Sequence, residues 1–184
     1  SRQSQKILQR INTKVFTRPN LLMRNMDLIL KHLHTRLKEF DCLTEERRWE
    51  FPEINKTIAN SNLFLEFEGD YWRSIDFISS SKSIEIATKS SQAYETGFAV
   101  GFFHQLLMDL DANNIISPIK DFHNLKSYLF DYDRCLDSSE NSFNSQSHYI
   151  GSEKIIGFIS SRRNDIENIY NLISTTSNNY VIHG

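Results

Sequence analysis

Three polar side chains that could bind a hydroxylated ligand stand close together in this sequence. Asp121, His123 and Asn124 lie among apolar residues in the stretch 118–125, where a turn should precede a helix. Their carboxylate, imidazole and amide groups supply the paired donors and acceptors that sugar hydroxyl and acetamido groups require. The same residues could instead satisfy backbone N–H groups as a turn and helix cap. The pattern leaves both interpretations open.

The sequence offers no metal-binding pattern beside this cluster. His32 and His34 are two residues apart, which points them to different helix faces, and no histidine is spaced to pair with His123. Cys42 and Cys135 are widely separated, which suits free thiols in a reducing compartment. Neither a Gly-x-Gly-x-x-Gly nor a Walker motif occurs in the 184 residues. We therefore predict no metal ligands.

A second candidate is a cation near the start of the chain. Residues 5–16 alternate loosely and are rich in Ile, Leu, Val and Phe, which predicts a strand. Leu8 and Arg10 should then share one face of that strand. From this spacing alone, Arg10 is an exposed cation on an edge strand.

A helix is predicted from about 19 to 39. Thr17 can cap it, and Pro19 fits its first turn because the missing N–H costs little there. Asn25 lies on the apolar face and could hydrogen-bond to Arg10. The residues that define this face recur every three or four positions: Leu22, Met26, Ile29, Leu33 and Leu37.

A hairpin should follow this helix. Residues 63–67 and 71–78 form its strands, and Glu68-Gly69-Asp70 has turn chemistry. The polar stretch 79–83 then suggests a crossover and a domain boundary at about 79.

The next element is a core helix from about 91 to 110. Ser91 can cap it, Glu95 opposes its dipole, and Gly97 and Gly101 suggest close backbone packing. Its expected buried stripe consists of Ala93, Val100, Phe103, Leu107 and Leu110.

The last third of the chain should hold a surface loop, further helices and a strand. The loop spans about 137–152, and the isoleucines of 155–173 predict one or two helices with Arg162 and Arg163 solvated. Residues 180–182 form the predicted strand.

Composition narrows the class of protein. With 39% hydrophobic residues and 13 Phe, the chain can bury a core, and a net charge of −2 without a basic block argues against nucleic-acid binding. No apolar run approaches the roughly 20 residues of a membrane span, and no signal peptide is evident. We expect a cytoplasmic protein.

Five stretches together resemble a known family. They are 7–12 (Ile-Leu-Gln-Arg-Ile-Asn), 71–78, 93–111, Asp121-Phe122-His123-Asn124 and the final Val181-Ile182-His183-Gly184. This combination resembles the aminoglycoside phosphotransferase-like sugar kinases, and most closely the bacterial N-acetylhexosamine kinases. The resemblance implies an α+β fold: an incomplete two-lobe protein-kinase-like architecture with a partial small lobe at 1–78 and a partial helical large lobe at 79–184.

The resemblance also implies a role for each candidate residue. Leu8 would lie against adenine, Arg10 would hold the phosphates of ATP, and the backbone of Phe77 and Ile78 would bind the adenine edge. Without the resemblance, Phe77 and Ile78 are ordinary core residues. Asp121, His123 and Asn124 would bind the sugar.

In this family a catalytic Asp follows the His of the last strand, so the resemblance places it just after Gly184. The Mg2+ ligands are likewise expected outside the chain, and His183 would hold backbone geometry. We therefore expect an ATP-dependent phosphotransferase whose present fragment is inactive alone and meets the rest of its protein or a homo-oligomer partner.

Two alternatives stay open. The parent could be a choline, amino alcohol or aminoglycoside kinase of the same fold, for which an acidic pocket would be favourable. The chain could also be a noncatalytic helical interaction domain that binds a partner through exposed apolar faces.

Overall fold

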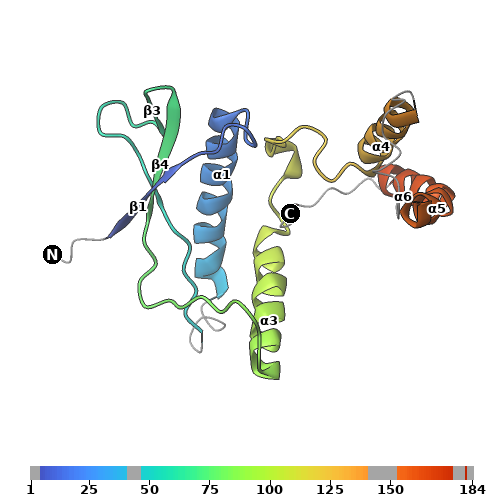
Figure 1. Ribbon diagram of the computed structural model, residues 1–184. Coiled ribbons are helices and arrows are strands. Elements are labelled where there is room, and N and C mark those ends of the chain that lie inside the picture. Colours follow the sequence, from blue (N-terminus) through green and yellow to red (C-terminus); the bar gives the residue numbers. More distant parts are fainter. Residues whose placement is uncertain (1–4, 41–46, 141–152, 176–180, 182–184) are drawn as a thin grey trace. The chain divides into compact units, whose positions relative to one another are not determined.

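The computed structural model describes residues 5–40, 47–140, 153–175 and 181 (Figure 1). The chain divides into two compact units, one of residues 1–119 with 180–184 and the other of residues 120–179. The first combines a small antiparallel sheet with helices, and the second contains helices, so the fold is mixed α and β. The expected boundary near residue 79 falls inside the first unit.

The sheet is built around one central strand. β4 (Asp70–Asp76) pairs with β1 (Lys6–Arg10) along one edge, with Gln9 opposite Arg73. Along its other edge it pairs with β3 (Leu65–Phe67) and then with β2 (Ile54–Asn55). All three pairings are antiparallel, and β2 was not predicted.

The predicted hairpin is confirmed. Glu68 and Gly69 join β3 to β4 with φ angles of 51° and 79°, the left-handed conformation that a two-residue hairpin turn requires. Gly adopts this conformation without steric penalty, which explains its place in the turn.

The strand predicted over 5–16 is too long. β1 ends at Arg10, and the ladder continues only through the Ile11 N–H, which donates to the Tyr71 carbonyl at 2.8 Å. The Asn12 carbonyl then accepts from the N–H groups of Val15 and Phe16, so the backbone turns. The strand was predicted too long because the residues that follow Arg10 are also rich in apolar side chains.

The first predicted helix is present as α1 (Pro19–Leu37), followed by the short 3-10 helix η1 (Lys38–Phe40). Pro19 opens α1 as expected, but Arg18 rather than Thr17 precedes it, and no side chain caps the helix. α1 lies beside the sheet (Figure 1).

The main core of the first unit lies between α1 and α3 (Ser90–Leu107). Its buried side chains are Leu33, Phe102, Leu106 and Leu107. The predicted stripe is therefore only partly correct, because Val100 and Ala93 are exposed. Ser91 does not cap α3; instead the side chain of Gln92 accepts from the Thr88 and Lys89 N–H groups at 2.8 and 3.0 Å.

The glycines of α3 do not mark a close approach. Nothing lies within 4 Å of a Cβ placed on Gly97 or Gly101, so the prediction of close backbone packing is wrong. After α3, the short helix η2 (Ala112–Asn114) begins where the Asp111 side chain accepts from the Asn113 N–H.

The second unit contains α4 (Leu125–Glu140), α5 (Glu153–Ser160) and α6 (Arg163–Thr175). Residues 155–173 thus form two helices, as one of the predicted arrangements had it, while 137–140 belong to α4 rather than to a loop. The rest of that loop and the predicted strand at 180–182 lie outside the described residues, apart from Val181, which packs against the α1–α3 core.

Within the described residues, no helix is both long and apolar enough to span a membrane.

Candidate functional site

The sheet has one face toward α1 and one face away from it. Arg73 donates to the sulfur of Met26 in α1 at 3.2 Å, and Gln9 lies directly opposite Arg73. Because side chains alternate along a strand, Leu8 and Arg10 lie on the other face. They share a face, as predicted, and it is the face that α1 does not cover.

Apolar side chains line this outer face. Leu65 pairs with Trp72 and Phe67 with Asp70, which places them on the same face as Arg10. Leu8, Leu65 and Phe67 are 67%, 51% and 57% exposed. Side chains this exposed can accept a flat apolar ligand such as an aromatic ring.

Charged groups gather at the end of β1. Arg10 forms an ion pair with Asp70, with 3.1 Å between its Nη1 and the Asp70 Oδ2, and both side chains are well exposed. With Lys14 they line a hollow of about 370 Å³. An exposed ion pair contributes little stability, and Arg has further N–H donors, so an anionic ligand can compete with Asp70 here.

Arg73 adds a third cation beside this hollow. It lines an adjoining hollow of about 390 Å³ together with Gln9 and Arg10, and its Nε donates to the Gln9 Oε1 at 3.1 Å. Partial burial lowers the pKa of the Arg73 guanidinium by desolvation. The sequence analysis did not identify Lys14, Asp70 or Arg73 as site residues, because the strand register that brings them together is not visible in the sequence.

Asn25 does not bind Arg10, contrary to the sequence expectation. It is buried in the first unit and its amide hydrogen-bonds to the backbone of Ile116. Arg10 lies on the face of the sheet away from α1, where Asn25 does not reach it.

Phe77 and Ile78 follow directly on β4. The Phe77 N–H donates to the Gln5 carbonyl at 3.0 Å, and the Ile78 carbonyl accepts from the Ser81 hydroxyl at 3.0 Å. Phe77 is 44% exposed, which is high for a core residue. One backbone group of each residue is thus used within the protein.

The polar cluster forms the turn before α4. Asn124 caps this helix, since its Oδ1 accepts from the N–H groups of Lys126 and Ser127 at 3.1 Å. Asp121 and His123 have left-handed φ angles of 54° and 57°, and both side chains are exposed. The capping interpretation therefore describes Asn124, while Asp121 and His123 keep side chains available to a ligand.

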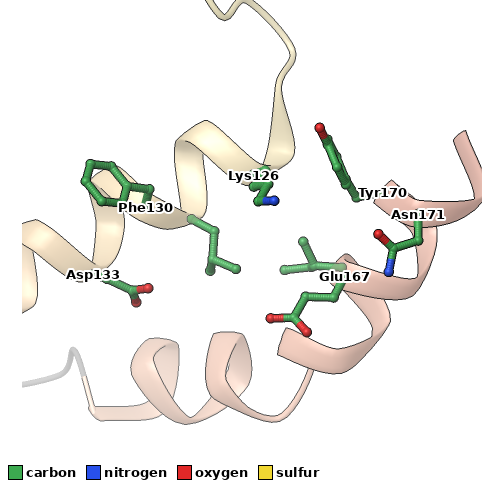
Figure 2. Close-up of a pocket in the computed structure, with 8 residues that line it drawn as sticks. Lys126, Phe130, Asp133, Glu167, Tyr170 and Asn171 are labelled. Atoms are coloured by element: carbon green, nitrogen blue, oxygen red, sulfur yellow. The ribbon is translucent and has the colours of Figure 1, made fainter. Parts of the chain in front are cut away.

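A further hollow of about 390 Å³ lies between α4 and α6 (Figure 2). Lys126, Phe130 and Asp133 come from one helix, and Glu167 and Tyr170 face them from the other. The Lys126 ammonium lies 5.3 Å from the centre of the Tyr170 ring. This groove combines an apolar floor with charges of both signs.

One ion pair joins α4 to α6 beside the groove. Arg163 donates from both terminal nitrogens to the two oxygens of Asp133, at 3.0 and 2.5 Å. These hydrogen bonds lower the pKa of Asp133 and raise that of Arg163. The expectation that Arg163 is solvated is therefore wrong, whereas Arg162 stacks on the Phe158 ring at 3.7 Å.

No protein-family model matches this chain. Within the residues that the structure describes, no group of three or more His, Cys, Asp or Glu side chains is arranged to hold a metal ion. The described residues present two candidate binding surfaces: an apolar sheet face that ends in cations, and an exposed polar turn before α4.

Proposed function

We propose that this chain is part of an ATP-dependent small-molecule kinase, with an N-acetylhexosamine or a related sugar as the acceptor. One observation carries the proposal. β1 and β4 are neighbouring antiparallel strands, so a single strand pair bears Leu8 and Arg10 and leads directly into Phe77 and Ile78. The four residues expected to bind nucleotide come from distant parts of the sequence: Leu8 and Arg10 lie on β1, and Phe77 and Ile78 directly follow its neighbour β4.

The order of elements supports the same proposal. A strand with a cation, a long helix, a hairpin and a polar crossover into further helices follow one another as a kinase small lobe requires. In protein kinases the strand cation pairs with a Glu of the helix, whereas Arg10 pairs with Asp70 of the sheet. In the proposed site, the acidic partner of Arg10 is therefore Asp70 of the hairpin and not a residue of α1.

In this proposal the adenine lies on the exposed apolar face at Leu8 and the phosphates lie at Arg10. Lys14 adds positive charge beside Arg10, which favours a polyphosphate. The sugar would bind at Asp121 and His123. Such a kinase also requires a proton acceptor and Mg2+ ligands, which the proposal does not assign to residues of this chain.

The proposal is tested on the protein encoded by the full reading frame of the source gene. Steady-state kinetics with N-acetylhexosamines should show kcat/KM reduced more than about tenfold by Arg10→Ala, since a charge-assisted phosphate contact is lost. Arg10→Lys should recover part of the activity, because a point charge replaces a planar fork. Arg24→Ala, at an exposed position of α1, is the matched control.

Two results would count against this function. Reading the source gene beyond the codon for Gly184 should reveal an Asp at once, followed within a few residues by an Asn. A stop codon there, or a longer protein that transfers no phosphate from ATP to any sugar, amino alcohol or aminoglycoside, would overturn the kinase assignment.

A second candidate function is a noncatalytic interaction domain. The observation that favours it is the second unit, whose apolar side chains are extensively exposed, among them Phe130, Phe158 and Ile173. A stop codon after Gly184 would favour this candidate.

A further inference from the structure

The groove between α4 and α6 contains none of the residues proposed to bind nucleotide or sugar. Its volume is about 390 Å³. Leu129 and Ile166 lie half-buried in it, and the rings of Phe130 and Tyr170 also line it (Figure 2). A hollow of this size suits a small organic molecule, whereas a protein partner needs a much larger surface.

Two contacts show that the helices run antiparallel along this groove. Lys126, near the start of α4, lies against Tyr170, toward the end of α6. Asp133, farther along α4, binds Arg163 at the start of α6. Glu167 precedes Tyr170 by three residues, about 4.5 Å along the axis of α6. Lys126 and Glu167 therefore line different levels of the same groove.

Both of these charges keep their hydrogen-bonding capacity for a ligand. In the part of the chain that the structure describes, neither the Lys126 ammonium nor the Glu167 carboxylate forms an ion pair. The Tyr170 ring attracts the ammonium through its face and leaves its three N–H donors available. Arg163 lies near Glu167, but both of its terminal nitrogens donate to Asp133. A cation and an anion thus line one apolar hollow without neutralising each other.

We propose that this groove binds a free α-amino acid with a large apolar side chain. Lys126 binds the carboxylate of the ligand, Glu167 binds its ammonium, and its side chain lies on the apolar lining. A free amino acid carries both charges on one carbon atom, so it can use both contacts at once. An amine or a carboxylic acid can use only one of them. This inference does not rest on the proposed kinase function.

The ligand class is tested on the chain as it stands, by NMR titration with L-phenylalanine. We expect the amide signals of α4 and α6 to shift with a Kd of about 1 mM, which is ordinary for a ligand of this size. L-Phenylalaninamide lacks the carboxylate and N-acetyl-L-phenylalanine lacks the ammonium. Each should bind at least about fivefold more weakly, since one charge-assisted contact is lost. Glycine should bind more weakly for a different reason, because it buries no apolar surface.

Three results of this titration would overturn the proposal. One is the absence of shifts in α4 and α6 at about 10 mM L-phenylalanine. Another is tighter binding of the amide, which would show a site for organic cations. The third is tighter binding of the N-acetyl form, which would show a site for carboxylates.

Two substitutions assign the charges to their residues. Lys126→Met should abolish the preference for L-phenylalanine over its amide, and Glu167→Gln the preference over the N-acetyl form. Both side chains are exposed, so neither change removes a buried contact. Lys154→Met and Glu153→Gln, at exposed positions of α5, are the matched controls and should keep both preferences. A preference that survives its substitution would overturn the proposal, and a protein without kinase activity would leave it standing.

Discussion

The two compact units of this chain differ in how their helices are held. In the first, α1 and α3 enclose side chains that solvent hardly reaches: Leu33 is 2% exposed, and Leu106 and Leu107 are at most 1% exposed. In the second, no described side chain of α4, α5 or α6 is buried. Both units are rich in apolar residues, so composition alone does not separate them.

The contrast shows that amphipathic helices need a facing surface before their apolar residues contribute to stability. The first unit provides this surface twice, through α3 and through the sheet. The described part of the second unit places Phe130, Phe158 and Ile173 at 66%, 57% and 63% exposure. Its clearest specific contact is between charges, in the Arg163–Asp133 pair.

The largest expected effect is therefore in the core of the first unit. Leu106→Ala removes a side chain that is fully buried, and we expect the free energy of unfolding to fall by about 2–5 kcal/mol. Ile173→Ala, at 63% exposure in α6, should change it by no more than about 0.5 kcal/mol. Urea unfolding, followed by peptide-resolved hydrogen exchange, measures both.

The contrast between the two units would be contradicted by a large effect of Ile173→Ala. Should Ile173→Ala destabilise the chain as much as Leu106→Ala does, then the second unit is covered in solution. Sedimentation would show whether a second copy supplies that cover.

The elements that sequence reasoning found are those whose signal is local. The apolar face of α1 recurs every three or four residues, and the hairpin turn at Glu68-Gly69 is fixed by the backbone freedom of one glycine. β2 has only two residues and exists through its pairing with Ile75 and Ser74 of β4, so nothing in its own sequence marks it. The extent of β1 was overestimated for a related reason, because apolar composition does not reveal where a strand loses its partner.

Choosing the buried side of α3 failed because that helix has aromatic residues on more than one side. Phe102 belongs to the buried core, whereas Phe98 and Phe103 are partly buried and pack against it. In the candidate site, Leu8 and Arg10 were predicted to share a face, and they do. Asp70 as the partner of Arg10, and Ile116 as the partner of Asn25, are 60 and 91 residues away, and no local pattern encodes such a distance.

The next expected effect concerns how the stability of the second unit depends on pH. Hydrogen bonds from Arg163 lower the folded-state pKa of Asp133, so the pair stabilises the fold fully above the unfolded pKa of an Asp. This stabilisation is lost as pH falls through the lower, folded value, which means below about pH 4. Protection of α4 and α6 in hydrogen exchange should therefore decline with acidification.

Asp133→Asn isolates that contribution. It should weaken α4 and α6 at neutral pH and make their protection less sensitive to acid. The first unit contains a counterpart, since Arg47 lowers the pKa of Glu95 through two hydrogen bonds at 3.0 and 3.1 Å. Glu95→Gln should act less on protection there, because the buried α1–α3 core also holds α3. Equal losses in the two units would contradict the view that only the second depends on its ion pair.

The smallest expected effect comes from two glycine substitutions, which test whether the two units unfold together. Gly101 in α3 and Gly157 in α5 both have open space around an added Cβ. Replacing either by Ala should stabilise its helix by about 0.5–1 kcal/mol, since Ala loses less backbone entropy on folding. Because each unit is compact by itself, we expect Gly157→Ala to slow hydrogen exchange in α5 and leave α1 and α3 unchanged, and Gly101→Ala to do the reverse. Slower exchange in both units from either change would show that they unfold as one, and that their unequal cores share a single cooperative transition.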